Sequence, residues 1–209
     1  MNFADAKTIT IPEGAVQKIS VGGVTIWKKS SPGGLPSGYT FTEHCQFNAN
    51  KVFDTGFKPT QNTRIEIKFI PESTSAQYLY GIRSTNNTAS VTAYLPSSGA
   101  WRFGNTYKNY TVTNGNEYTF IVDNSGVYMN GAFSKYVATV KNFTCAYTLP
   151  LGTARTTSGS MPAAQFVGKV LYFKIFEDDT PVLDWVPCNS PDGVNAFWDN
   201  LAGKFVTPI

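Results

Sequence analysis

The sequence predicts an all-β fold of antiparallel strands, and three observations support this prediction. Short apolar segments recur at roughly ten-residue spacing, with turn residues between them. No stretch of useful length has the 3.6-residue period of a helix, and only residues 195–201 would suit a short helical turn. Aromatic residues make up 14% of the chain, and these residue types are enriched in strands. Strands that recur in this way are typical of a sandwich or a barrel.

The N-terminal part of the chain predicts a small β-module. Alternating segments cover residues 8–11, 18–21 and 24–27, and the last two flank Gly22-Gly23. A two-residue glycine loop between such segments favours a β-hairpin. A lone hairpin is marginal in water, and about thirty residues cannot build a core of their own. We therefore expect this module to dock on another surface or to mediate self-association.

A segment rich in Ser, Pro and Gly separates the module from the rest of the chain. Residues 31–38 read Ser-Pro-Gly-Gly-Leu-Pro-Ser-Gly, a composition typical of a linker. The sequence therefore predicts a β-module at residues 1–30, a linker at 31–38 and a single sandwich at 39–209.

The strongest strand signal in the main part covers residues 64–69. Polar and apolar residues alternate strictly there, and a period of two places Ile65, Ile67 and Phe69 on one face. This segment is expected to be a strand with one buried face and one charged face.

Two further regions predict hairpins. Residues 118–129, followed by Asn130-Gly131, carry two turn signals and predict a three-strand meander. Residues 170–176 predict a long strand, and the turn at 177–181 returns it into the next apolar segment.

Charge, hydropathy and cysteine content exclude several classes of function. The net charge is +3, and the longest basic run is Lys28-Lys29, so the basic stripe of a nucleic-acid groove is absent. No apolar run reaches the roughly 18 residues of a membrane span, and the N-terminus lacks the apolar core of a signal peptide. The 3 cysteines are too few and too widely spaced for a disulfide framework, which favours folding in a reducing cytoplasm.

Two ordered sets of residues resemble the concanavalin A-like lectin/glucanase superfamily, in the LamG-like form common in phage structural proteins. They are Leu35 to Tyr39 with Val52 to Pro59 and the strand from Arg64, and Gly168 to Phe176 with Leu183 to Cys188, Gly193 to Asp199 and Gly203 to Phe205. The resemblance implies a jelly roll of two packed antiparallel sheets, each of about six or seven strands. It also implies carbohydrate or surface binding. The N-terminal hairpin resembles small β-modules of tailed-phage virion proteins.

The sequence does not predict a catalytic or metal centre. Enzymes of the superfamily carry Glu-x-Asp-x-Glu on one strand, whereas the strand that begins at Glu66 has Lys68 and Ile70 at the later positions. The only histidine, His44, precedes Cys45, and neighbours in a strand point to opposite faces. We expect no catalytic residue, no cofactor and no zinc site. Calcium remains an alternative, with oxygen ligands from Asp123, Asn124, Asp178, Asp179 and Asp199.

Two groups of residues are candidates for sugar contacts, because sugars combine apolar ring faces with hydroxyls that need hydrogen-bond partners. Trp101, Arg102 and Tyr107 form the first group, and Tyr80 and Arg83, with Tyr78 beside them, form the second. The alternative is that these strand aromatics face the core.

These observations together predict a phage virion structural protein, that is, a tail, fibre or capsid-surface adhesin. It would be assembled in the host cytoplasm, contact other virion proteins through the N-terminal module, form a homo-oligomer and bind glycans through the sandwich. The alternatives are a glycan-cleaving enzyme, an accessory carbohydrate-binding module, and an architectural decoration protein without a ligand. No nucleic-acid or membrane partner is expected.

Overall fold

The structure is a computed structural model that describes residues 18–21, 24–28, 35–85, 88–95, 99–135, 142–161 and 165–209. The chain divides into two compact units, residues 1–34 and 35–209. This division falls inside the segment expected to be a linker, of which residues 31–34 lie outside the described part.

The first unit contains an antiparallel strand pair. Strand β1 (Lys18–Val21) pairs with β2 (Val24–Lys28), and the register places Val21 opposite Val24. This pairing agrees with the predicted hairpin. The Gly22-Gly23 loop and the alternating segment at residues 8–11 lie outside the described residues.

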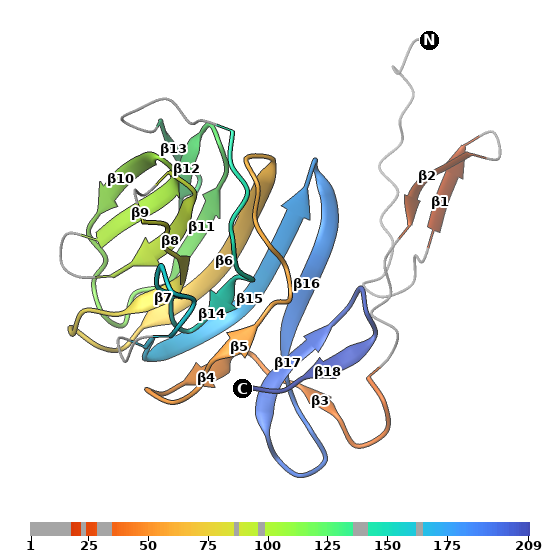
Figure 1. Cartoon of the computed structure of the whole chain (residues 1–209). Coiled ribbons are helices and arrows are strands. Elements are labelled where there is room, and N and C mark those ends of the chain that lie inside the picture. The colour runs from red at the N-terminus through yellow and green to blue at the C-terminus, as the bar shows by residue number, and fades with distance from the viewer. Residues whose placement is uncertain are drawn as a thin grey trace. The chain divides into compact units, whose positions relative to one another are not determined.

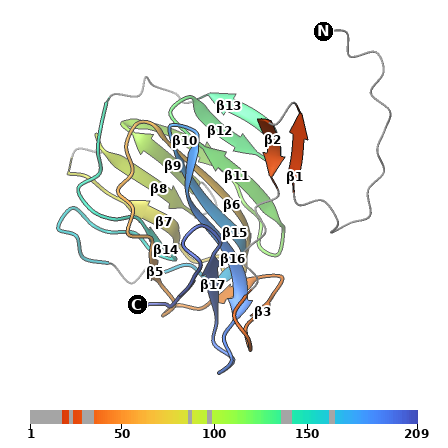
Figure 2. The ribbon, with the colours of Figure 1, turned by 90° about the vertical axis from the view of Figure 1, so that its right-hand side faces the viewer.

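The second unit consists of two antiparallel sheets (Figures 1 and 2). The smaller sheet has the order β10-β9-β8-β7-β14-β5, with β5 Phe53–Asp54, β7 Tyr78–Ile82, β8 Ser90–Tyr94, β9 Gly99–Gly104, β10 Thr106–Tyr110 and β14 Pro150–Leu151. The larger sheet has the order β13-β12-β11-β6-β15-β16-β17-β18, with β3 paired to β16 and β4 to β15. Its strands are β3 Thr40–Phe41, β4 Cys45–Phe47, β6 Thr63–Pro71, β11 Tyr118–Val122, β12 Gly126–Met129, β13 Ala132–Lys135, β15 Gly168–Glu177, β16 Thr180–Asn189, β17 Asn195–Asp199 and β18 Lys204–Val206.

The predicted all-β sandwich of two antiparallel sheets is confirmed, with two corrections. The sheets have six and ten strands, not six or seven each, because short strands and a C-terminal hairpin extend the larger one. The expected helical turn at residues 195–201 is wrong. Residues 195–199 form β17, whose Phe197 faces the core while the next residue, Trp198, pairs with Phe205 of β18. In the described part of the chain, no helix is long and apolar enough to cross a membrane.

Aromatic side chains from the two sheets meet in one core. The ring of Trp101 on β9 lies 4.0 Å from that of Phe120 on β11, measured between centroids. Phe53 on β5 approaches Phe197 on β17 at 5.0 Å in an edge-to-face arrangement, the geometry that aromatic quadrupoles prefer. These rings are fully buried, so they join the sheets face to face along the length of the sandwich.

Strand β6 has the burial pattern that its sequence predicts. Burial alternates without exception from Thr63 to Pro71, and Ile65, Ile67 and Phe69 are completely buried. The charged side chains between them lie on the outer face of the larger sheet. β6 pairs with β11 on one side and β15 on the other, so it lies near the middle of that sheet.

Two tight turns join neighbouring strands of the larger sheet. Asn130 and Gly131, between β12 and β13, have φ of 49° and 83°, and Asp178 and Asp179, between β15 and β16, have φ of 49° and 59°. Positive φ at both central residues defines the type I′ turn, whose twist matches that of the flanking strands. Asn, Asp and Gly are the residues that tolerate this conformation, so both predicted hairpins form.

The cysteine thiols are expected to be unreactive in the folded protein. Cys45, Cys145 and Cys188 are free and buried, and burial raises the thiol pKa from 9.0 to about 12 for Cys45 and Cys145 and to about 11 for Cys188. Because the thiolate is the reactive form, a thiol reagent at pH 8 should modify the native protein very slowly and all 3 cysteines after unfolding in guanidinium.

The same pKa shifts give a pH dependence of stability. The unfolded thiols lose their protons near pH 9, before the folded ones do, so the stabilising contribution is complete below pH 9 and declines as pH rises towards 12. A free energy of unfolding that does not fall between pH 9 and 12 would contradict this pH dependence. Rapid modification of any one thiol in the native protein at pH 8 would contradict the expected protection of the thiols.

Candidate ligand-binding site

A polar pocket lies at the upper end of the larger sheet in Figure 1, where three segments of the chain converge. The start of β6, the end of β11 and the turn between β15 and β16 share this end because neighbouring strands run antiparallel. The pocket has a volume of ≈ 240 Å³ and is lined by Gln61, Asn62, Thr63, Arg64, Asp123, Asn124, Asp178 and Asp179. Ordinary small-molecule sites have about 300–1,000 Å³, so this pocket would hold one small polar unit.

Glu177, the last residue of β15, fixes the segment that precedes β6. Thr60 donates a hydrogen bond from Oγ1 to Glu177 Oε1, and Thr63 donates one from Oγ1 to Glu177 Oε2 at 2.7 Å. The backbone N–H of Asp178 donates to the carbonyl of Asn62 at 3.3 Å. These bonds join two sides of the pocket, so its lining is preorganised rather than carried on independent loops.

Arg64 is held on the outer face of β6 by three contacts. Its Nη1 lies 3.1 Å from Asp179 Oδ1, and its Nε lies 3.3 Å from Glu66 Oε1. The guanidinium carbon lies 4.1 Å from the ring centroid of Phe176, a cation–π contact. The guanidinium therefore has a defined position beside the pocket.

Asp123 shapes the third side of the pocket. Its Oδ1 accepts hydrogen bonds from Ser125 N at 2.7 Å, Ser125 Oγ at 2.6 Å and Gly126 N at 3.2 Å, which is the pattern of an Asx-turn. Asn124, next in the chain, is exposed. The lining contains three carboxylates and one guanidinium, so its excess is two negative charges, which disfavours anionic ligands.

Four of the five residues considered for calcium, Asp123, Asn124, Asp178 and Asp179, line this pocket. Asp199 does not: it is buried, and its Oδ1 accepts hydrogen bonds from the backbone of Leu201 and Ala202 at 3.0 and 3.2 Å. Within the described residues, no group of three or more His, Cys, Asp or Glu is placed to hold a metal ion.

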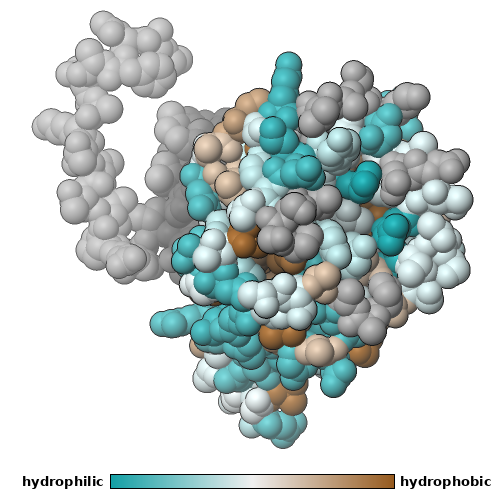
Figure 3. Space-filling model, turned by 90° about the vertical axis from the view of Figure 1, so that its left-hand side faces the viewer, coloured by the Kyte–Doolittle hydropathy of each residue, from teal (hydrophilic) through white to brown (hydrophobic). Residues whose placement is uncertain are grey.

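The structure brings Arg102 and Tyr107, two of the sequence-predicted ligand residues, together on the outer face of the smaller sheet. They are cross-strand partners on β9 and β10, and the Arg102 guanidinium carbon lies 5.6 Å from the Tyr107 ring centroid. Tyr107 is 40% exposed. Figure 3 looks onto the side of the molecule on which β9 and β10 lie in Figure 1, and shows a mostly hydrophilic surface there.

Trp101 and Tyr80 are core residues, so their prediction as ligand contacts is corrected. Both side chains are 0% exposed, and their ring centroids lie 5.8 Å apart in an edge-to-face contact within the core. Burial raises the pKa of the Tyr80 hydroxyl. Trp101 precedes Arg102 on one strand, so the two side chains point to opposite faces. The residue types alone do not reveal which face is buried.

Arg83 is exposed but lies apart from the pocket lining. It directly follows β7, and its backbone N–H donates to the carbonyl of Arg155 at 3.0 Å. Tyr78, at the start of β7, is half-buried against Tyr94, with ring centroids 4.7 Å apart. Within the described part of the chain, no ring contact or side-chain hydrogen bond joins Arg83 or Tyr78 to Arg102 or Tyr107.

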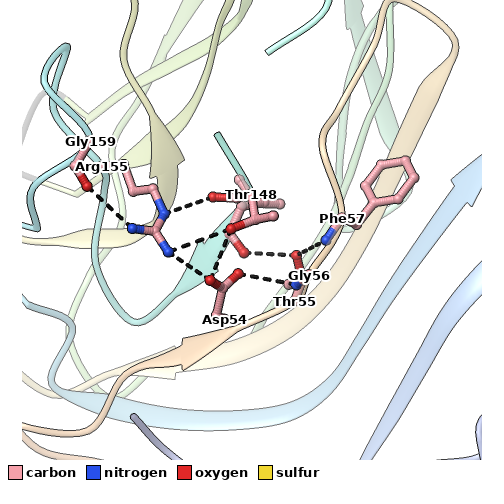
Figure 4. A network of polar contacts seen from close by, with 8 residues as sticks. Asp54, Thr55, Gly56, Phe57, Thr148, Arg155 and Gly159 are labelled. Carbon is pink, nitrogen blue, oxygen red and sulfur yellow. Dashed lines mark hydrogen bonds and ion pairs between the residues drawn. The ribbon is translucent and has the colours of Figure 1, made fainter. Parts of the chain in front are cut away.

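A second polar network joins loops at the edge of the smaller sheet (Figure 4). Arg155 Nη2 lies 2.6 Å from Asp54 Oδ2, which also accepts a hydrogen bond from Thr148 Oγ1 at 2.9 Å. Arg155 Nε donates to the Thr148 carbonyl at 3.0 Å, and Nη1 donates to the Gly159 carbonyl at 3.2 Å. These charged groups are engaged with the protein itself, so the network has a structural role.

The pocket is not predictable from the turn signals, because each turn is encoded separately in the sequence. Asp178 and Asp179 read as a solvated hairpin turn, which they form, and Asp123 and Asn124 read as a second turn. The signal that was available is that both turns combine carboxylates or amides at strand ends. Only the sheet order places them beside Gln61 and Asn62.

Comparisons with known proteins identify no family for this chain. No family model matches the chain, and no match was found among curated proteins. A heptameric SAP-like pentraxin from Limulus polyphemus is similar over 69% of this chain and 76% of its own, with 12% identity and a TM-score of 0.43. Domains LG4-5 of the mouse laminin α1 chain are similar over 68% of this chain and 45% of theirs, with 11% identity and a TM-score of 0.43. The two-sheet architecture itself agrees with the jelly-roll sandwich expected from the sequence.

Proposed function

We propose that the sandwich binds a neutral carbohydrate and that the pocket at the end of the larger sheet is where a sugar unit is held. The observation that carries this proposal is the lining, in which amides, carboxylates and a guanidinium from three segments converge. Sugar hydroxyls both donate and accept hydrogen bonds, and planar side-chain groups of these types pair with them in fixed directions. The domain would act by binding, without catalysis.

The charge of the pocket narrows the ligand class. The lining residues carry an excess of two negative charges, and the outer face around Arg64 adds Glu66. Phosphates, sulfated sugars and nucleic acids would be repelled. On binding, a neutral sugar would lose only its hydrogen bonds to water, and the polar groups that line the pocket would replace them.

The test is a glycan array with neutral and acidic glycans, followed by titration of the best neutral glycan. We expect binding to neutral glycans only, and an affinity loss of about tenfold for the Asn62→Ala/Asn124→Ala double variant, because each side-chain hydrogen bond contributes about 0.5–1.5 kcal/mol. Both residues are exposed, so the fold should be unaffected. Asn116→Ala is the matched control, since Asn116 is exposed and precedes β11 at the opposite end of that strand.

Two outcomes would replace this proposal. Release of reducing ends from a polysaccharide panel above the buffer rate would indicate a glycan-cleaving enzyme. No detectable binding, either on the array or to whole cells, would favour an architectural decoration protein without a ligand.

We also propose that the chain is a phage virion structural protein, as the sequence resemblance suggests. The free, buried cysteines fit folding in a reducing cytoplasm, and the N-terminal β-pair would attach the sandwich to other virion proteins and support a homo-oligomer. Mass spectrometry of purified particles should detect the chain, and light scattering should give a mass above that of one chain. A chain that is absent from the particles and monomeric at high concentration would refute this assignment.

A further inference from the structure

Two exposed aromatic side chains lie side by side on the outer face of the larger sheet. Tyr128 on β12 and Phe133 on β13 are cross-strand partners, and their ring centroids are 4.7 Å apart with planes at 41°. Tyr128 is 36% exposed and Phe133 is 48% exposed. Ile121 of β11 is in register with Tyr128 and is half-buried. Cross-strand aromatic pairs stabilise hairpins, but this pair also leaves ring surface open to a ligand.

The aromatic pair adjoins the polar pocket through Gly126. The Gly126 N–H donates to Asp123 Oδ1 at 3.2 Å, and the Asp123 N–H donates to the Gly126 carbonyl at 3.2 Å. A Cβ at Gly126 would lie 2.8 Å from Phe133 Cε2, so the Phe133 ring lies against the bare backbone of a residue that Asp123 holds. Tyr128 is two residues further along β12, which corresponds to about 7 Å. The surface therefore changes from hydrogen-bonding groups to aromatic rings within a short distance.

A chain of sugar units matches this sequence of surfaces. Pyranose rings have apolar C–H faces that pack on aromatic rings, and hydroxyls at their edges that need polar partners. We propose that Tyr128 and Phe133 form a second subsite, which stacks the sugar unit next to the one held in the pocket. This inference rests on the proposed carbohydrate-binding function, and it names the ligand class as a neutral oligosaccharide rather than a single sugar.

The experiment compares ligand lengths by calorimetry on the full chain. The probes are glucose, galactose and N-acetylglucosamine and their β-linked di- and trisaccharides. We expect the disaccharide of the preferred series to bind about tenfold more tightly than the monosaccharide, because its second unit would stack on the two rings. Phe133→Leu and Tyr128→Leu should each remove most of this increase and leave the monosaccharide affinity unchanged.

Control variants separate ring stacking from loss of structure. Leucine keeps apolar volume in the hairpin but has no ring face, and Tyr128→Phe keeps the ring and should retain the length dependence. Phe41 on β3 is 50% exposed and outside the pocket lining, so Phe41→Leu should change nothing.

The outcomes distinguish the subsite from the pocket. Two results would overturn the subsite and leave the proposed function intact. The first is a length dependence that is undiminished in Phe133→Leu and Tyr128→Leu. The second is a wild type without length dependence, while the Asn62→Ala/Asn124→Ala variant still loses monosaccharide binding. No binding of any of these sugars by the wild type overturns both. A dimer that Phe133→Leu dissociates would show that the pair contacts a second copy of the chain, and would also overturn the subsite.

Discussion

Replacing Trp101 by alanine is expected to destabilise the sandwich by about 3–5 kcal/mol, the range found when a buried aromatic residue is truncated. Trp101 is 0% exposed and contacts Phe69, Phe120 and Tyr80, at centroid distances from 4.0 to 6.5 Å. These partners come from both sheets, so the cavity would lie between the layers. Neighbouring strands are fixed by their hydrogen bonds and could not collapse to fill it.

Urea unfolding followed by far-ultraviolet circular dichroism would measure this loss. Tyr107→Ala is the control, because Tyr107 is 40% exposed on the strand next to Trp101 and its loss should cost at most about 1 kcal/mol. If the two variants were equally stable, Trp101 would not join the sheets as described here.

Gly168→Ala is expected to cost about 3 kcal/mol through the backbone rather than through the core. Gly168 begins β15 with a φ of 153°, and a Cβ there would lie 2.2 Å from the carbonyl oxygen of Ile70 and 3.1 Å from the Cα of Pro71. Both atoms belong to the backbone of β6, so no side-chain rotation can relieve the clash. Either β15 and β6 would have to move apart where Gly168 pairs with Pro71, or residue 168 would have to lose this pairing.

Gly193→Ala tests whether the clash, rather than the loss of glycine, is responsible. Gly193 has a φ of 76°, but a Cβ there would have no atom within 4 Å. Its substitution should therefore cost only the strain of the left-handed conformation, about 1 kcal/mol. Equal losses of unfolding free energy for the two variants would mean that the close approach of Gly168 to β6 does not contribute to the destabilisation.

The fold was predictable from the sequence because its signals are local. The alternation at β6 and the turns at Asn130-Gly131 and Asp178-Asp179 are each encoded within a few residues. The helical turn expected at residues 195–201 failed because β17 is short and carries adjacent aromatics on both faces, which hides its period of two.

The candidate site was less predictable because it depends on sheet order. Tyr80 and Trp101 have the residue types of a sugar-binding surface, yet they lie on the core face of their strands. Arg102 and Tyr107, which belong to one candidate group, do lie beside each other, because a tight hairpin pairs their strands. The pocket, in contrast, unites residues near positions 61, 123 and 178, and no local pattern indicates which strand ends will be neighbours.

The position of β6 between β11 and β15 has a consequence for biosynthesis. β6 ends at Pro71, whereas β15 starts only at Gly168, after every strand of the smaller sheet has been translated. Until then, one long edge of β6 has no native partner, and an unpaired apolar edge is prone to aggregation. The native pairing of β6 can therefore be completed only after the last fifth of this sequence, from Gly168 onward, has been translated.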